Sequence, residues 1–269
     1  MPTEIRSKTA RSILSKASGF ASAFDYTLNP YSGCAFGCTY CYAAFFAVND
    51  DLKAEWGHWV EVKENALDLL RKKRSTSLSA NTIYMSTVTD PYQPVERTLE
   101  LTRAILRELL EYHQPKLMIQ TRSPLVTRDI DLLRQFDHVR VNMTVTTDDD
   151  EVRRAFEPTC PSNAQRLAAI TEVAAAGIET CITMTPLLPV RDPEIFADAL
   201  HATGAQRYVV QHFHGNQHRR FAAGTGEAAV QLLRERGWSA ADYARVKRVL
   251  AARLSPLLEG RDGFAPAWT

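Results

Sequence analysis

Three cysteines, Cys34, Cys38 and Cys41, lie within eight residues of one segment of the sequence. A disulfide joins two sulfur atoms and would leave the third thiol unpaired. A cubane iron-sulfur cluster instead takes one thiolate for each iron that the protein holds. Three thiolates on four irons leave one iron with an open coordination position, where a substrate or cofactor can bind the metal directly. The segment therefore predicts a reactive cluster rather than a purely structural one.

Two other interpretations of the cysteines stay open. Zinc needs a fourth ligand, and no second C-x2-C or H-x3-H pattern follows to supply one at the usual spacing. Cys38 and Cys41 could form a thioredoxin-like redox pair, but a third cysteine lies four residues upstream and no helix-opening pattern follows. The other cysteines, Cys160 and Cys181, are expected to be ordinary residues.

Composition limits the class of protein. A chain of 269 residues can bury about three-quarters of its unfolded surface, which suits one large domain or a domain with an appendage. The 32 Lys and Arg residues nearly balance 31 Asp and Glu, so any affinity for nucleic acid must be local. The sequence has no run of 18 apolar residues, and the thiolates require a reducing compartment. We expect a cytoplasmic protein with no membrane partner.

Short β-branched runs alternate with helical patterns, which predicts an α/β fold. The expected strands are 26–29, 83–89, 116–121, 139–146, 178–185 and 208–213, and the helices between them are 95–112, 127–136, 162–176 and 193–203. Repeated strand-helix units imply a parallel sheet with right-handed crossovers, and six units can curve into a partial (β/α)6 barrel. Residues 56–63 fit either a strand or an irregular excursion.

We expect three parts along the chain: an N-terminal extension (1–20), the partial barrel (21–215) and a C-terminal helical segment (216–269). Two amphipathic helices, 228–236 and 240–254, are expected in the last part, with Ser239 as the N-cap of the second.

Polar residues follow the expected strands, at 87–93, 121–123, 142–144, 183–186 and 211–214. In parallel α/β barrels the functional residues gather at the C-terminal ends of the strands. A zwitterionic ligand with a ribose needs a carboxylate, a cation and hydroxyl groups, and these segments supply all three. Turns after strands are commonly polar in any protein. Each of these residues could therefore be an ordinary turn residue that binds no ligand.

The spacing C-x3-C-x2-C, with an aromatic residue before the third cysteine, resembles the signature of the radical S-adenosylmethionine (radical SAM) superfamily. Residues 27–31, 38–42, 87–93, 121–123 and 157–158 narrow the resemblance to its spore photoproduct lyase-like group, over roughly residues 20–215. The resemblance implies a partial (β/α)6 barrel, a [4Fe-4S] cluster, SAM and an electron donor such as flavodoxin or ferredoxin. It also implies reductive cleavage of SAM to a 5′-deoxyadenosyl radical that abstracts hydrogen from a substrate.

The same resemblance implies roles for individual residues. It places the cluster on the three cysteines, the SAM amino group on Asp90 and the SAM carboxylate on Arg122. The other implied residues are Ser123 at the cofactor site, Thr144 at the ribose, Tyr40 at the adenine and Tyr42 in radical transfer.

One departure from the lyase pattern affects the expected substrate. The lyase returns hydrogen to its product radical from a cysteine just before a Thr-Ser-Asp segment, and the corresponding residues 86–90 contain no thiol. We therefore expect hydrogen abstraction from an unidentified substrate. Spore photoproduct lyase-like DNA repair, with nucleic acid as substrate, and a non-catalytic iron-sulfur or zinc-binding protein remain alternatives.

Two further clusters of polar residues have open interpretations. His212 and His214 share one face of an expected strand, and His218, Arg219 and Arg220 follow. These histidines could act as catalytic acids or bases, bind phosphate or metal, or form structural hydrogen bonds. The basic run 71–74 is expected to compensate the negative end of a helix rather than bind nucleic acid.

Overall fold

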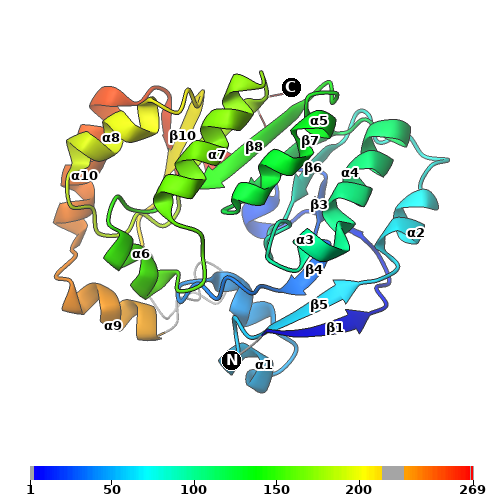
Figure 1. The fold of residues 1–269 in the computed structure, drawn as a ribbon, viewed down its shortest axis with the longest axis horizontal. Helices are drawn as coiled ribbons and strands as arrows, with labels where there is room; N and C mark the ends of the chain where they lie inside the picture. The colour runs from blue at the N-terminus through cyan, green and yellow to red at the C-terminus, as the bar shows by residue number, and fades with distance from the viewer. Residues whose placement is uncertain (1–2, 214–226, 267, 269) are drawn as a thin grey trace.

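A computed structural model describes residues 3–213, 227–266 and 268, and these form two sheets with helices on one side (Figure 1). The strands are β1 (Glu4–Lys8), β2 (Leu14–Lys16), β3 (Tyr26–Leu28), β4 (Tyr31–Gly33), β5 (Trp59–Lys63), β6 (Thr82–Met85), β7 (Lys116–Thr121), β8 (Val139–Thr144), β9 (Glu179–Met184), β10 (Arg207–Val210) and β11 (Leu257–Glu259).

The α-helices are α1 (Asp50–Ala54), α2 (Ala66–Arg71), α3 (Glu96–Leu99), α4 (Leu101–Tyr112), α5 (Ile130–Leu133), α6 (Asp150–Phe156), α7 (Asn163–Ala175), α8 (Pro193–His201), α9 (Glu227–Glu235) and α10 (Ala240–Arg253). Short 3-10 turns are η1 (Gly19–Ala21), η2 (Tyr42–Phe46), η3 (Pro124–Asp129) and η4 (Gly260–Phe264).

Strand pairing confirms the partial parallel barrel. The six predicted strands correspond to β3, β6, β7, β8, β9 and β10, which lie next to one another in that order and pair in parallel. β11 adds a parallel strand at one edge and β2 an antiparallel strand at the other. Within the described residues the two edges do not pair, so the barrel is open. A separate small sheet has the order β1-β5-β4.

The two faces of the main sheet have different partners. On β7, Leu117 and Ile119 are fully buried in the core shared with the helices, and each such side chain stabilises the fold by about 2 kcal/mol. The intervening Met118 and Gln120 belong to the inner face, where they accept hydrogen bonds from Asn142 of β8. This period-two pattern places polar groups such as Gln120 on the inner face, beside an apolar cluster that includes Met118.

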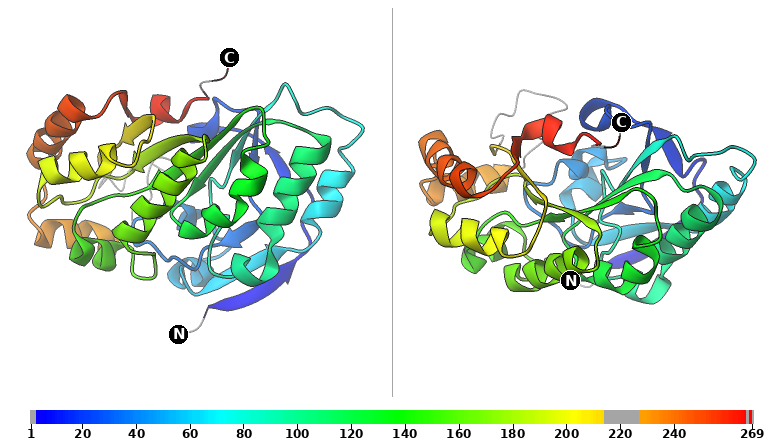
Figure 2. Two further views of the ribbon diagram at one scale, coloured as in Figure 1. Left: turned by 45° about the horizontal axis from the view of Figure 1, so that its top comes forward. Right: turned by 90° about the horizontal axis from the view of Figure 1, so that it is seen from above.

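The C-terminal segment covers the inner face of the sheet. Phe264 of η4 lies edge-on to Phe20 of η1, with ring centroids 4.8 Å apart, and stacks on Tyr84 of β6. The turns η1 and η4 therefore meet on the side of the sheet away from α4, α5 and α7, as the right panel of Figure 2 shows. The C-terminal part thus contributes a strand and a turn to the barrel as well as helices.

Several elements differ from their sequence-based prediction. The helix predicted at 95–112 is two helices, because the Glu96 carboxylate accepts hydrogen bonds from the backbone amides of Thr102 (2.9 Å) and Arg103 and so starts α4 anew. The helix predicted at 127–136 is the turn η3 followed by the short α5. Segment 56–63 ends in β5, which pairs with β4. Ser239 is the N-cap of α10, as predicted.

Candidate functional site

A cavity of about 530 Å³ opens at the C-terminal ends of the barrel strands. Its walls bring together nearly all of the residues that the sequence singled out: Cys34, Cys38, Tyr40, Cys41, Tyr42, Asp90, Arg122, Thr144 and His212. These residues come from residues 34–42, called the cysteine loop below, from the end of β8 and from the segments after β6, β7 and β10. Polar residues at the strand ends therefore face one common space.

The cysteine loop leaves the small sheet through a crowded glycine. Gly33 ends β4 with a φ of +73°, and an added Cβ would lie 2.5 Å from the carbonyl oxygen of Trp59. Gly37, inside the loop, packs so closely on Gly57 that a Cβ there would approach the Gly57 Cα to 3.1 Å. Glycine is required at both positions because the loop runs directly against the chain around β5.

The donor set of the loop fits an iron-sulfur cluster. Among the described residues, no three His, Cys, Asp or Glu side chains converge on a point where they could hold a single ion. A cluster does not need such convergence, because each thiolate binds its own iron. Two buried polar groups on the cavity wall, Trp56 Nε1 and Ser86 Oγ, have no hydrogen-bond partner among the residues described. An indole N–H can only donate, so a sulfur-rich group beside it would supply the missing acceptor.

Cys38 differs from the other two cysteines in its surroundings. Arg122 donates from Nη1 to Cys38 Sγ at 3.0 Å, and the Cys160 sulfur lies 3.6 Å away. The pKa of the Cys38 thiol is lowered, chiefly because Cys160 donates a hydrogen bond to it and also because of the Arg122 charge, although burial opposes both. Burial raises the pKa of the Cys34 thiol well above its usual value and that of Cys41 to about 12.

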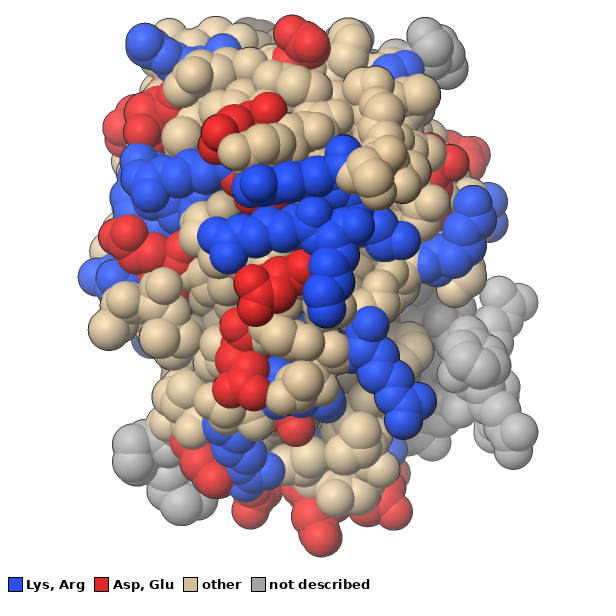
Figure 3. All heavy atoms as spheres, turned by 90° about the vertical axis from the view of Figure 1, so that its right-hand side faces the viewer, with Lys and Arg blue, Asp and Glu red and all other residues tan. Residues whose placement is uncertain are grey.

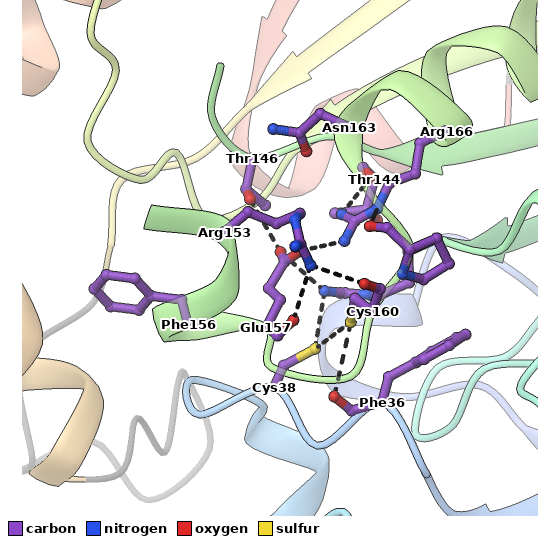
Figure 4. Close-up of polar contacts among 12 residues, drawn as sticks. Phe36, Cys38, Thr144, Thr146, Arg153, Phe156, Glu157, Cys160, Asn163 and Arg166 are labelled. Atoms are coloured by element: carbon purple, nitrogen blue, oxygen red, sulfur yellow. Dashed lines mark hydrogen bonds and ion pairs between the residues drawn. The ribbon is translucent and has the colours of Figure 1, made fainter. Parts of the chain in front are cut away.

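Glu157 joins the cysteine loop to the barrel through a fully buried hydrogen-bond network (Figure 4). Its carboxylate accepts from Arg166 Nη2 (2.5 Å), Arg122 Nη1 (3.1 Å), Thr146 Oγ1 (2.9 Å) and the Tyr40 hydroxyl. Burial alone would raise the pKa of Glu157, but the charges of Arg166 and Arg122, with the hydrogen bonds, hold it at about 2. Glu157 is therefore a carboxylate at neutral pH and fixes the guanidinium beside Cys38.

Glu157 belongs to a motif in the sequence, whereas neither Arg166 nor Cys160 is among the predicted site residues. A signal for Arg166 exists in α7. Arg166, Ile170 and Val173 are all buried and are spaced as one helix face, so a charged residue occupies a position where the pattern requires an apolar one. No comparable signal marks Cys160, because its neighbour Cys38 is 122 residues away in sequence. The expectation that Cys160 and Cys181 are ordinary residues stays a prediction, although the Cys160 sulfur contacts that of Cys38.

The predicted SAM-binding residues are held by hydrogen bonds within the protein. The Asp90 carboxylate accepts from the backbone amides of Tyr92 (2.9 Å) and Arg122 (2.9 Å) and from Thr121 Oγ1 (2.8 Å). Burial raises its pKa, while these bonds act in the opposite direction. Thr144 Oγ1 lies on the barrel wall and accepts from Gln120 Nε2 at 2.8 Å. The site is therefore organised before any ligand enters.

Ser123 has a different position. Its side chain accepts a hydrogen bond from the Leu125 amide and caps η3, and it lies outside the cavity wall.

The two tyrosines of the cysteine loop have distinct contacts. Tyr40 is buried, and its hydroxyl contacts both Arg122 and Glu157. Tyr42 is about one-third exposed, lines the cavity and donates its hydroxyl to the Thr87 carbonyl. Of the two tyrosines, Tyr42 is the one that is open to solvent.

The histidine pair can be described only in part. His212 lines the cavity, and its ring lies edge-on to Tyr243 at 4.7 Å between centroids. His214, together with His218, Arg219 and Arg220, lies outside the described residues.

The basic run 71–74 is largely paired with acidic residues. Arg74 makes a bidentate ion pair with Glu108 of α4 at 2.6 Å, and Arg71 contacts Asp68. On the face at the right of Figure 1, Lys and Arg side chains are interleaved with Asp and Glu (Figure 3). This arrangement agrees with the expected structural role.

The described part of the chain contains no helix that could span a membrane.

An open parallel barrel with three cysteines at its mouth defines the class of protein. Residues 28–202 match the family model of the radical SAM superfamily, and the chain belongs to this superfamily. Membership agrees with the predicted cofactors, because SAM and a [4Fe-4S] cluster are those of the superfamily.

The chain is similar to several known proteins. It is 37% identical over 164 residues to an uncharacterised protein of Methanocaldococcus jannaschii, covering 61% of each chain. It is 33% identical over 186 residues to an uncharacterised protein of Mycobacterium tuberculosis, covering 66% of this chain and 54% of that protein. The matches thus span less than two-thirds of either relative. The structure of spore photoproduct lyase complexed with dinucleoside spore photoproduct has the same fold, with a TM-score of 0.62 and 13% identity over 95% of this chain and 81% of that one.

Proposed function

We propose that this chain is a radical SAM enzyme that abstracts a hydrogen atom from a substrate other than the spore photoproduct. The observation that carries the proposal is the single cavity in which Cys34, Cys38 and Cys41 face the ends of the barrel strands. When bound there, the cluster and SAM together supply the electron transfer and the 5′-deoxyadenosyl radical. A reductant is a general need of such enzymes, and we propose a flavodoxin or ferredoxin as the electron donor.

Asp90 and Arg122 have the capacity to orient a zwitterion. A carboxylate offers about four acceptor sites, and Asp90 uses three of them within the protein, which leaves one for an ammonium group. Among the described residues, the side-chain contacts of Arg122 with Cys38, Tyr40 and Glu157 all involve Nη1. Its Nε and Nη2 therefore keep donors for a carboxylate. Thr144 would supply a hydroxyl to the ribose.

Aromatic side chains enclose the remaining space. Phe20, Tyr42, Tyr84 and Phe264 line the cavity, and Phe20 and Phe264 are in contact with each other. Such a wall limits the contact of water with a reactive intermediate. We propose Tyr42 and His212 as the catalytic residues nearest the substrate, because both line the cavity. One side of the cavity is open to solvent.

The positions of the thiols support a reaction other than lyase-type repair. Within the described residues, the cysteines on the cavity wall are Cys34, Cys38 and Cys41, all assigned to the cluster. Cys160 lies behind Cys38, and Cys181 is buried on the barrel floor beside Val209 and Phe264. Ser86 occupies the cavity wall in the segment where the lyase pattern has its cysteine. No additional thiol is thus placed to return hydrogen to a product radical.

The test uses anaerobically reconstituted protein with SAM, a chemical reductant and DNA that contains spore photoproduct. We expect 5′-deoxyadenosine without release of thymine, because the enzyme can cleave SAM but cannot complete the repair. A Cys41→Ala variant serves as the control and should form neither product. Efficient thymine release by the wild type would overturn the proposed substrate preference and favour the DNA-repair alternative.

A further inference from the structure

The sulfur atoms of Cys38 and Cys160 are in direct contact. They lie 3.6 Å apart, and both side chains are at least nine-tenths buried (Figure 4). Cys160 comes from the turn after α6, far from the cysteine loop in sequence. The proposed reaction does not use Cys160.

Hydrogen bonds hold the two segments side by side. The Thr39 amide donates to the Phe156 carbonyl at 2.9 Å, and Thr159 Oγ1 donates to the Ala35 carbonyl at 2.6 Å. The Cys160 thiol itself lies 3.7 Å from the Phe36 carbonyl. These hydrogen bonds lie on either side of the cysteine pair. The position of the two backbone segments therefore brings the sulfurs together, and the contact does not depend on the side-chain rotamers alone.

Both cysteines are buried, but only one of them faces the cavity. Cys38 lies on the cavity wall, whereas Cys160 is not part of that wall and stands behind it. Arg122 Nη1 donates a hydrogen bond to Cys38 Sγ at 3.0 Å and so holds this sulfur at the wall. A small reagent that enters the cavity therefore meets Cys38 first, and the Cys38 sulfur that it modifies lies 3.6 Å from the Cys160 sulfur.

We propose that Cys38 and Cys160 form a reversible disulfide when the cluster is absent. This inference rests on the proposed function only in that Cys38 is a cluster ligand. The Cys38 thiolate attacks one sulfur of a small disulfide, which forms a mixed disulfide and releases one thiolate. Cys160 gives up its proton and attacks Cys38 Sγ, which forms the protein disulfide and releases the second thiolate. Two protein thiols are oxidised, and one small disulfide is reduced to two thiols.

The consequence is a protected but inactive site. A sulfur–sulfur bond is about 2.0 Å long, so the two sulfurs must approach by about 1.6 Å to form it. In the disulfide, Cys38 cannot bind iron, and it is also shielded from oxidation to sulfinic acid, which is irreversible for most proteins. A dithiol reductant restores both thiols and with them the capacity to accept a cluster.

The experiment uses metal-free protein and 2-hydroxyethyl disulfide without air, followed by alkylation, digestion and mass spectrometry. We expect a linked pair of peptides that contain Cys38 and Cys160, and the loss of two titratable thiols. In Cys160→Ala and Cys160→Ser the second step is removed, so Cys38 should instead accumulate the 2-mercaptoethanol adduct. Cys181→Ala is the matched control, because it removes a buried cysteine from the barrel floor and should leave the 38–160 link intact.

Two results overturn the inference: Cys160 remains free in the wild type, or Cys38 links to Cys34 or Cys41 instead. Iron uptake is measured separately on reduced protein, so that failure of the cluster assignment is distinguished from failure of the disulfide. The oxidised wild type should take up iron only after treatment with dithiothreitol.

Discussion

The carboxylate of Glu157 and the guanidinium of Arg166 form an ion pair of 2.5 Å in which both side chains are fully buried. The same carboxylate holds Arg122, which reaches Cys38. The start of α7 is thereby connected to the cysteine loop through three charged residues. This connection explains why the charge of Arg166 is tolerated on the buried face of α7. It also determines how much the free energy of unfolding falls when one partner is removed.

Glu157→Gln should destabilise the fold strongly. It leaves the guanidinium groups of Arg166 and Arg122 buried without a counter-charge, and loss of one partner of a buried pair costs about 3–5 kcal/mol. Denaturant unfolding of the metal-free protein at neutral pH measures the difference. Glu172→Gln, on the exposed side of α7, is the matched control and should change the free energy of unfolding by less than about 0.5 kcal/mol. Equal stability of the two variants would contradict the role of the pair.

The stability of the wild type should depend on pH through Glu157. Its pKa is about 2 in the folded chain against about 4.5 for an ordinary glutamate, so the folded state favours the charged form. The resulting stabilisation, about 3 kcal/mol, is fully present above pH 4.5 and is lost as the pH falls toward 2. The difference in unfolding free energy between wild type and Glu157→Gln should therefore shrink over that range. A difference that stays constant with pH would show that Glu157 titrates normally.

Gly33→Ala should disturb the cysteine loop more than an alanine at another left-handed glycine. At Gly33, with a φ of +73°, a Cβ would overlap the Trp59 carbonyl and ring, with distances of 2.5–2.6 Å. At Gly177 the φ is +80° and no atom lies within 4 Å, so only backbone strain of about 1–2 kcal/mol applies. We expect Gly33→Ala to cost about 1–3 kcal/mol more than Gly177→Ala. Thermal unfolding and iron uptake of the two variants test this, and equal effects on both would rule it out.

The sequence predicted the barrel well because its strands carry strong local patterns. Each of the six strands that form the continuous parallel order has a β-branched or apolar run, and the polar residues after them share one edge by topology alone. β4 and β11 are three residues long, too short for any periodicity, and both depend on pairing with distant strands. β3 is equally short, and its prediction rests on its place at the start of the series of six strands rather than on a periodicity.

The site residues that lie close together in sequence could be predicted. Those that meet only through tertiary contacts could not. Cys34, Cys38 and Cys41 are neighbours in sequence, so their spacing carries the information. The contact of Cys38 with Cys160 spans 122 residues, and that of Arg122 with Glu157 spans 35. These contacts depend on how α6 and α7 pack against the loop, and no single segment encodes that packing.

The most direct test of the account is the composition and reactivity of the anaerobically reconstituted protein. The account predicts about four irons per chain and 5′-deoxyadenosine after reduction in the presence of SAM. Cys34→Ala, Cys38→Ala and Cys41→Ala should each abolish the nucleoside, whereas Cys181→Ala should retain it. Zinc in place of iron, or 5′-deoxyadenosine formed by any of the three loop variants, would contradict the assignment of this loop to a cluster with one open iron.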